Sequence, residues 1–287
     1  MTELKVAFAG LGAMGHPMAG HLARAGLLAA VWNRTHSKAD ALAAELKVDA
    51  PATIAEFARD CDVIALCVPA DADVLALAHE IALHAREGTV VVDHSTVSSV
   101  TARAAAAALA ERGCMFLDAP VSGGVEGAKN GKLSIMCGGS AEAMAKAEPL
   151  MQAYALRIVH IGEAGAGQTT KMVNQIAIAG VLQGLSEALR FAQASDLDLA
   201  RVFEAISGGA AASWQMLNRW ESMSEDRFDF GFAVDWMRKD LGLTLDEAKR
   251  NGAVLPLTAL VDQFYAEVQK MGGGRNDTSS LVRRLPR

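Results

Sequence analysis

Three glycines near the start of the chain have the spacing of a dinucleotide-binding loop. Gly10, Gly12 and Gly15 follow an apolar run and precede a helical segment. In such a loop the first glycine allows a tight turn, the second lets the backbone approach a pyrophosphate, and the third lets the helix pack close to the strand. A glycine-rich structural turn is the alternative. We expect nucleotide contacts from the whole loop: Gly10, Leu11, Gly12, Ala13, Met14 and Gly15.

The second apolar run ends in Asn33, Arg34 and Thr35, at a place where an NAD site often has an acidic residue. A carboxylate there accepts hydrogen bonds from the ribose 2′-hydroxyl of NAD and repels the 2′-phosphate of NADP. Arg34 can instead make a forked contact with that phosphate, and Asn33 and Thr35 can donate to it. We therefore predict that NADP binds here. In the alternative, Arg34 is a solvated loop residue and NAD binds without the acid.

Two further strand ends are predicted to line the same crevice, because ligands of such sheets bind at the carboxyl ends of the strands. The run "LCVP" brings Val68 and Pro69 to this edge, and "VVDHST" brings Ser95 and Thr96. Either pair can equally be the ordinary end of a strand. We include all four residues as candidate cofactor contacts.

Residues that could react with a substrate stand further along the chain. The segment "GQTTKMVNQ" places Lys171 and Asn174 three positions apart, so that both project from one face of a helix. A lysine there can transfer a proton; in the alternative, Lys171 extends to solvent and Asn174 makes a structural hydrogen bond. The segment "DAPVSGG" offers the hydroxyl of Ser122 and the backbone N–H groups of Gly123 and Gly124, which suit a carboxylate.

The elements that must position these residues change character along the chain. Short, nearly continuous apolar runs alternate with helical segments up to about residue 162, which predicts an α/β fold with a mainly parallel sheet and helices on both faces. After that point helical patterns dominate, beginning with a long buried helix over residues 169–194. We divide the chain into a dinucleotide-binding domain, an interdomain helix and an all-α substrate and oligomerisation domain, at residues 1–162, 163–194 and 195–287.

The composition argues against several classes of function. Of the 287 residues, 51% are apolar and 21% are charged, and the net charge of −6 argues against nucleic acid as the main partner. The four cysteines are spaced too widely for a zinc motif or a redox CxxC pair, and the seven histidines form no metal-ligand pair. We see neither a secretory signal nor a membrane span. We expect a cytoplasmic protein that binds no metal.

Four segments together resemble the β-hydroxyacid dehydrogenase family, which includes 3-hydroxyisobutyrate dehydrogenase, tartronate semialdehyde reductase and the glyoxylate and succinic semialdehyde reductases. The segments follow the family's order: "AFAGLGAMGHPMAGHL", "DAPVSGGVEGAKNGKLSIMCGG", "GAGQTTKMVNQ" and "FGFAVDWMRKDLGL". The resemblance implies a Rossmann-type domain, a long interdomain helix and an all-α C-terminal domain, assembled as homodimers or homotetramers. It also implies reversible oxidation of a short 3-hydroxy acid, with NAD or NADP as hydride acceptor.

The resemblance also assigns roles to particular residues. It implies that Lys171 transfers the proton and that Asn174 holds the substrate beside it. Residues 122–124 would bind the substrate carboxylate. Lys239 would reach the cofactor from the helical domain, and Thr96 would contact it near the nicotinamide.

Three places bear on which member of the family the chain is most similar to. Gln175 stands where many members carry a second asparagine, and the tartronate semialdehyde type also has glutamine. The segment "VWNRTHSK" is more similar to the NADPH-preferring semialdehyde reductases than to the NAD enzymes. In the helical domain, Trp214 either walls the substrate pocket or packs between helices.

These observations favour an NADP-preferring 3-hydroxyacid dehydrogenase or semialdehyde reductase with a small-molecule substrate. The nearest alternative is an NAD-dependent 3-hydroxyisobutyrate or serine dehydrogenase. From a different class, the chain could be a nucleotide-binding module without turnover, because fold alone does not establish function. A 6-phosphogluconate dehydrogenase is disfavoured because its helical domain is far larger than the one available here. The hydroxy acid itself is left open.

Overall fold

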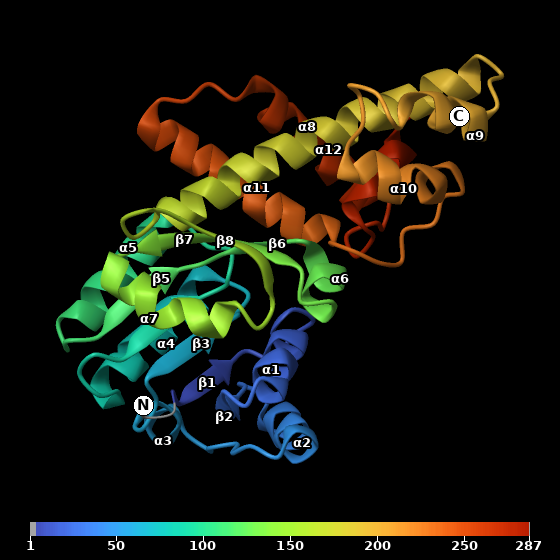
Figure 1. Cartoon of the computed structure of the whole chain (residues 1–287). Coiled ribbons are helices and arrows are strands. Elements are labelled where there is room, and N and C mark those ends of the chain that lie inside the picture. Colours follow the sequence, from blue (N-terminus) through green and yellow to red (C-terminus); the bar gives the residue numbers. More distant parts are fainter. Residues whose placement is uncertain (1–3, 287) are drawn as a thin grey trace. The chain divides into compact units, whose positions relative to one another are not determined.

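The computed structural model describes residues 4–286 (Figure 1). The chain divides into two compact units, the first ending at Lys171 and the second beginning at Met172. Strands and helices alternate in the first unit, and helices build the second. The border falls inside the long helix, and the three-part division at residues 162 and 194 stays a prediction.

The first unit follows the expected alternation of strands and helices. Its elements are β1 (Val6–Ala9), α1 (Gly15–Arg24), β2 (Leu28–Trp32), α2 (His36–Leu46), α3 (Ile54–Ala58), β3 (Val63–Leu66), α4 (Asp71–His84), β4 (Val90–Asp93), α5 (Ser99–Ala110), β5 (Met115–Asp118), β6 (Val121–Ser122), α6 (Gly124–Lys129), β7 (Leu133–Gly139), α7 (Ala141–Met151) and β8 (Ala155–Gly162). The long helix α8 (Ala166–Ala194) begins in this unit and continues into the second.

The strands form one sheet in the order β2-β1-β3-β4-β5-β7-β6, and β8 also pairs with β7. The neighbours from β2 to β5 are all parallel. Strand β7 runs antiparallel to β5 and β6 and parallel to β8. The sheet is therefore mainly parallel, as the alternation predicts, and the carboxyl ends of β1 to β5 meet at one edge.

Two apolar clusters cover the two faces of this sheet, because successive residues of a strand point to opposite faces. Val6 and Phe8 of β1 pack with residues of α1, α2 and α7, whereas Ala7 and Ala9 pack with residues of α3, α4 and α5. A strand covered on both faces needs a continuous apolar run. Strands β1, β3 and β4 are accordingly buried along their whole length, whereas β8 is largely exposed and the two-residue β6 does not stand out in the sequence.

Four helices of the described chain are absent from the sequence predictions. Helices α3 and α6 are too short for a periodic pattern to show. Helices α7 and α10 (Trp214–Ser224) are longer, and each begins after a serine that accepts a hydrogen bond from a backbone N–H three residues later. Those N-cap serines, Ser140 and Ser213, are the sequence signal that could have located both helices.

The second unit packs helices against the apolar stripe of α8. Its further elements are α9 (Leu199–Ile206), α10, α11 (Val234–Asn251), α12 (Pro256–Lys270) and the 3₁₀-helix η1 (Thr278–Arg284). Ala179 and Leu182 of α8 pack with residues of α11 and α12, and Leu185 and Leu189 pack with residues of α10. Within the described residues, no helix has the length and apolar character that crossing a membrane requires.

Candidate active site

The glycine loop between β1 and α1 has open space at one glycine and no space at the other two. Gly10 has a φ of +94°, which side chains rarely adopt, and a Cβ there would collide with the carbonyl oxygen of Cys67. A Cβ on Gly15 would collide with the carbonyl oxygen of Gly10, whereas Gly12 faces open space. This is the geometry that a pyrophosphate at a helix N-terminus requires, so the loop fits a dinucleotide.

The two side chains that follow β2 have different partners. Asn33 Oδ1 accepts from the N–H of Leu11, and its Nδ2 donates to the carbonyl oxygen of Thr35, both at 3.0 Å. Asn33 therefore ties the glycine loop to the turn after β2. The Arg34 side chain is 78% exposed, and its Nη1 donates to Asp73 Oδ1 at 2.9 Å. Contact of these residues with a 2′-phosphate stays a prediction, and the Asp73 carboxylate stands beside the proposed phosphate ligand.

Ser95 joins the ends of β3 and β4. Its Oγ accepts from the N–H of Val68 at 2.8 Å, and its own N–H donates to Asp93 Oδ1 at 2.9 Å. Thr96, the next residue, is half-buried, and Pro69 is exposed. The structure thus brings the four candidate contacts after β3 and β4 together at the carboxyl edge of the sheet.

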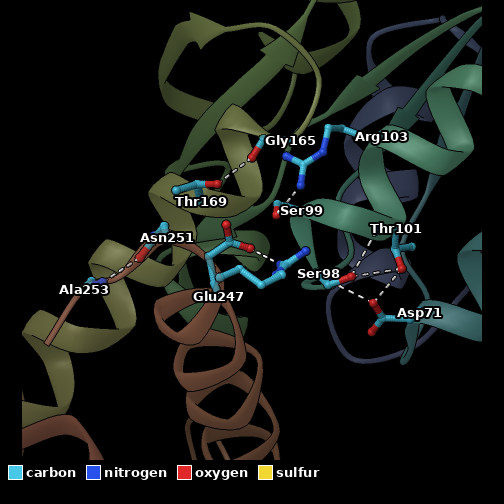
Figure 2. A network of polar contacts seen from close by, with 11 residues as sticks. Asp71, Ser98, Ser99, Thr101, Arg103, Gly165, Thr169, Glu247, Asn251 and Ala253 are labelled. Carbon is cyan, nitrogen blue, oxygen red and sulfur yellow. Dashed lines mark hydrogen bonds and ion pairs between the residues drawn. The ribbon is translucent and has the colours of Figure 1, made fainter. Parts of the chain in front are cut away.

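Asp71, the first residue of α4, accepts hydrogen bonds from the segment that follows Thr96. Its Oδ1 accepts from the N–H of Ser98 at 2.9 Å and from the hydroxyl of Thr101 at 2.7 Å (Figure 2). Ser98 also caps α5, because its Oγ accepts from the N–H of Thr101. Burial raises the pKa of Asp71, but the hydrogen bonds outweigh it and hold that pKa below its usual value. An ionised Asp71 therefore fixes the loop that carries Thr96.

The segment predicted to bind a carboxylate lies at the turn from β6 into α6. Ser122 stands opposite Ser134 of β7 in the sheet register. Gly123 and Gly124 have φ values of +127° and +61°, so that the turn requires residues without a side chain. Gly123 is exposed. This turn carries a hydroxyl and backbone N–H groups, and their contact with a substrate stays a prediction.

Lys171 lies near the start of α8, and only 7% of its surface is exposed. Asp118, the last residue of β5, fixes the beginning of this helix. Its Oδ1 accepts from the N–H of Gly165 at 2.7 Å, and its Oδ2 accepts from the N–H of Gln168 at 2.8 Å. Burial raises the pKa of Asp118, and the backbone N–H groups oppose this by stabilising the ionised form. Because Asp118 satisfies these N–H donors, the helix begins at Ala166 rather than at residue 169 as the sequence predicts.

In the second unit a chain of polar contacts joins Asn174 to Lys239. Asn174 Nδ2 donates to Gln175 Oε1 at 2.8 Å, and Gln175 Nε2 donates to Asp240 Oδ2 at 2.7 Å. Lys239 Nζ lies 3.2 Å from Asp240 Oδ1. Asp240 is 2% exposed and Gln175 is 1% exposed. Two buried residues, for which no role was predicted, thus hold the two predicted site residues.

Trp214 is not part of this chain of contacts. It is the first residue of α10 and is 53% exposed, and the guanidinium of Arg219 lies 4.8 Å from its ring centroid. The tryptophan that packs between helices is Trp220, which is 5% exposed and donates through Nε1 to the carbonyl oxygen of Leu199. Trp214 therefore lies outside the apolar core of its unit, and its place in a substrate pocket stays a prediction.

His94 follows β4 and is buried beneath the same edge of the sheet. Its Nδ1 lies 2.7 Å from the carbonyl oxygen of Ala119, and its Nε2 lies 2.7 Å from the hydroxyl of Tyr154. Because a carbonyl only accepts, Nδ1 carries the proton and Nε2 accepts from Tyr154. Burial lowers the pKa of His94 to about 4, so the ring is neutral near pH 7. Within the part of the chain that is described, no three His, Cys, Asp or Glu residues gather as metal ligands.

The site residues predicted from the sequence fall into two groups. The glycine loop, the ends of β2, β3 and β4, the turn at residues 122–124 and Lys171 belong to the first unit. Asn174, Trp214 and Lys239 belong to the second. Sequence reasoning missed Asp118 and Gln168, although both stand in the segments "DAPVSGG" and "GQTTKMVNQ" that it singled out. A polar residue at the end of an apolar strand is the signal that could have found Asp118.

Two family models cover nearly the whole chain. Residues 5–162 match the model of the NAD-binding domain of 6-phosphogluconate dehydrogenase. Residues 165–285 match the model described as NAD-binding of NADP-dependent 3-hydroxyisobutyrate dehydrogenase. The second model matches the helical part of the chain and relates that part to 3-hydroxyisobutyrate dehydrogenase.

Individual proteins agree with these family models. The chain is 50% identical over 284 residues to an uncharacterized oxidoreductase of Shewanella frigidimarina, with 98% of each chain covered. It is 35% identical to 2-hydroxy-3-oxopropionate reductase of Escherichia coli, with 98% of this chain and 97% of that protein covered. Among solved structures, the 3-hydroxyisobutyrate dehydrogenase of Mycobacterium tuberculosis with L-serine aligns with a TM-score of 0.92 at 30% identity, over 100% of both chains.

Proposed function

The chain belongs to the β-hydroxyacid dehydrogenase family, and on this basis we propose that it is an NADP-preferring enzyme that interconverts short semialdehyde or keto acids and the corresponding 3-hydroxy acids. As a member of this family it is an NAD(P)-dependent oxidoreductase that acts on CH–OH groups. The preference for NADP and the roles of individual residues are the proposal.

In this mechanism the side chains bind, orient and exchange one proton. When bound, a nicotinamide cofactor supplies or accepts the hydride. In the reducing direction, the Lys171 ammonium hydrogen-bonds to the carbonyl oxygen of the substrate and donates a proton to it as the carbonyl is reduced. The hydroxyl of Ser122 and the N–H groups of residues 123–124 bind the substrate carboxylate, and Asn174, one turn further along α8, orients the substrate. In the oxidising direction the neutral amine of Lys171 accepts the proton.

The burial of Lys171 is the observation that carries the proposal. A lysine is seldom buried without a reason, yet this one is 7% exposed and stands near the start of a helix fixed to the carboxyl end of β5. The carboxyl ends of the parallel strands are also where the dinucleotide loop lies. A proton-transfer group near a hydride donor is the arrangement that reduction of a carbonyl needs.

The proposed preference for NADP over NAD rests on the residues at the end of β2. Arg34 supports NADP, because an exposed guanidinium at this position can make a forked contact with the 2′-phosphate. Asp73 supports the alternative, NAD, because its carboxylate lies 2.9 Å from Arg34 Nη1 and can accept a hydrogen bond from a ribose hydroxyl. We favour NADP because no acidic residue occupies the strand end itself.

The test is the initial rate of NADPH and NADH oxidation by purified protein with a panel of short aldehyde acids. The panel holds glyoxylate and the tartronate, methylmalonate and succinic semialdehydes. We expect turnover with NADPH preferred, and a loss of about 10²- to 10⁴-fold in kcat for Lys171→Ala. Lys249→Ala, which removes a lysine whose side chain is 77% exposed, is the matched control and should retain the rate. Full activity of Lys171→Ala would refute the assigned role.

Three further properties stay predictions. A homodimer or homotetramer follows from the family resemblance, and light scattering coupled to gel filtration measures it. A cytoplasmic location agrees with the four free cysteines, none of which forms a disulfide. The substrate is proposed to be a small molecule rather than nucleic acid, because the net charge is −6.

A further inference from the structure

We propose that Asp118 and Gln168 are positioning residues for the proton transfer. Together they form a buried clamp that holds the start of α8 against the ends of β4 and β5 and so determines where Lys171 stands. The inference rests on the proposed role of Lys171. Both residues lie in the first unit, and they are 0% and 1% exposed.

The first half of the clamp is the carboxylate of Asp118, at the end of β5. Its two oxygens accept from the N–H groups of Gly165 and Gln168, at 2.7 and 2.8 Å. The approach is close enough that two glycines are required. A Cβ on Gly138 would lie 2.7 Å from Asp118 Oδ1, and one on Gly167 would lie 2.8 Å from Asp118 Oδ2. The backbone of the helix start therefore lies close against the strand ends, and the Asp118 carboxylate links the two.

The second half of the clamp is the carboxamide of Gln168, one turn before Lys171. Its Nε2 donates to the carbonyl oxygen of Ser95 at 2.8 Å, and its Oε1 accepts from the N–H of Val97 at 3.1 Å. These two bonds bracket Thr96, the residue expected beside the nicotinamide. The carboxamide is used in both directions, as donor and as acceptor, so only a side chain with both functions can replace it.

The two halves act on the same helical turn. Lys171 follows Gln168 by three residues, which is about 4.5 Å along the helix axis, so a displaced helix start displaces the lysine with it. The loop after β4 carries Thr96, and the chain after β5 carries residues 122–124. The clamp thus keeps Lys171 in a fixed relation to the predicted nicotinamide contact and to the predicted carboxylate-binding turn.

Fixed distances matter for proton transfer more than for nucleotide binding. A displacement of about 1 Å at a reacting group can lower a rate by about 10²-fold. The glycine loop and Arg34 follow β1 and β2, outside the clamp, and the clamp meets the predicted cofactor contacts only at Ser95 and Thr96, so cofactor affinity should change far less than kcat. If the clamp positions Lys171, its variants should lose kcat while their cofactor affinity changes little. If the clamp only stabilises the fold, kcat and the number of cofactor-binding sites should fall together, in proportion to the fraction of protein that is folded.

Two near-isosteric variants disturb one half each. Asp118→Asn replaces a carboxylate oxygen by an NH₂ group that faces a backbone N–H. Gln168→Glu replaces the NH₂ group by an oxygen that faces the carbonyl of Ser95. Asp198→Asn is the matched control, because Asp198 Oδ1 also accepts from two backbone N–H groups, those of Ala200 and Arg201, at the start of α9.

The measurement is steady-state reduction of the best aldehyde acid, with NADPH and with NADPH deuterated at C4, together with the NADPH dissociation constant from fluorescence titration. For both variants we expect kcat to fall about 10- to 100-fold and the dissociation constant to stay within about twofold. The deuterium isotope effect on kcat should rise, because the chemical step then limits turnover more completely. The control should match the native protein in all three quantities.

The outcomes separate this inference from the proposed function. If Lys171→Ala is inactive while Asp118→Asn and Gln168→Glu keep native kcat and isotope effect, the clamp is refuted and the proposed function stands. If kcat and the number of NADPH-binding sites fall together in both variants, the clamp is also refuted, because that result shows only a structural role for the two residues. If Lys171→Ala is active, the role of Lys171 on which the clamp rests fails, and if the native protein reduces no acid of the panel with either cofactor, the proposed function itself fails.

Discussion

The carboxylate of Asp73 should weaken the binding of NADPH relative to NADH. Asp73 Oδ1 lies 2.9 Å from Arg34 Nη1, and the two side chains are 27% and 78% exposed. An ion pair this exposed contributes at most about 1 kcal/mol, so it will not prevent Arg34 from reaching a phosphate. A 2′-phosphate on the same guanidinium would, however, stand near the negative charge of Asp73. Asp73→Asn removes that charge and retains the shape of the side chain.

The size of the effect follows from the charges and the screening. Two unit charges about 5 Å apart in water repel by about 0.8 kcal/mol, and a phosphate with nearly two charges roughly doubles this. Physiological salt, with a screening length of about 8 Å, removes about half. What remains is about 0.9 kcal/mol, or an affinity about four times higher for NADPH. NADH, which lacks the phosphate, should change by less than about twofold.

The assay is a fluorescence titration of native protein and variants with NADPH and NADH at two salt concentrations. The gain for NADPH should shrink as salt rises, because the repulsion is screened. Asp40→Asn, which removes an exposed carboxylate on α2, is the matched control for a change of net charge and should leave the ratio unaltered. Weaker NADPH binding in Asp73→Asn would refute the reasoning, since it would mean that Asp73 orients Arg34 for the phosphate.

Two further predictions concern stability and the glycine loop. The pKa of His94 lies near 4 in the fold against 6.5 unfolded, so the unfolded chain binds the extra proton as pH falls, and urea unfolding should show a loss of about 2 kcal/mol between pH 7 and 5. In His94→Gln that part of the pH dependence should disappear; an equal loss in the variant would contradict the assignment. Gly15→Ala should cost about 1–3 kcal/mol of stability through the collision with Gly10. Gly12→Ala, with open space for its Cβ, should retain stability within about 1 kcal/mol and lose affinity for NADPH instead, and thermal melts with titrations separate the two.

The parts of the fold that the sequence predicts are those whose signal is local. A short continuous apolar run such as "VIAL" between turn residues is typical of a buried strand, and the spacing of Gly10, Gly12 and Gly15 is typical of its turn. The α/β class, the mainly parallel sheet and the long helix were correct for this reason. The antiparallel pairing of β7 with β5 and β6 could not be predicted, because the direction of a strand in the sheet depends on pairing between distant segments.

The parts of the site that the sequence misses are those made by distant pairs. The bond from Gln168 to Ser95 spans 73 residues, and that from Gln168 to Asp118 spans 50. No pattern along the chain records such a contact. Arg34 was singled out from its position after a strand, but its ion-pair partner Asp73 was not, because they meet only when β2 and the start of α4 are side by side. A residue that belongs to a local sequence motif can therefore be predicted from the sequence, whereas the distant residues that hold it in position cannot.

The path of α8 across the border between the two units bears on how this chain could be recombined with its relatives. The glycines at residues 162–167 suggest a linker, and a chimera would ordinarily be joined there. A junction in that loop takes Asp118 from one parent and its partners Gly165 and Gln168 from another. A junction after Lys171, inside the helix, keeps them in one parent, because an uninterrupted helix accepts a change of sequence between turns. The safer point of exchange is therefore within regular structure rather than in the loop beside it.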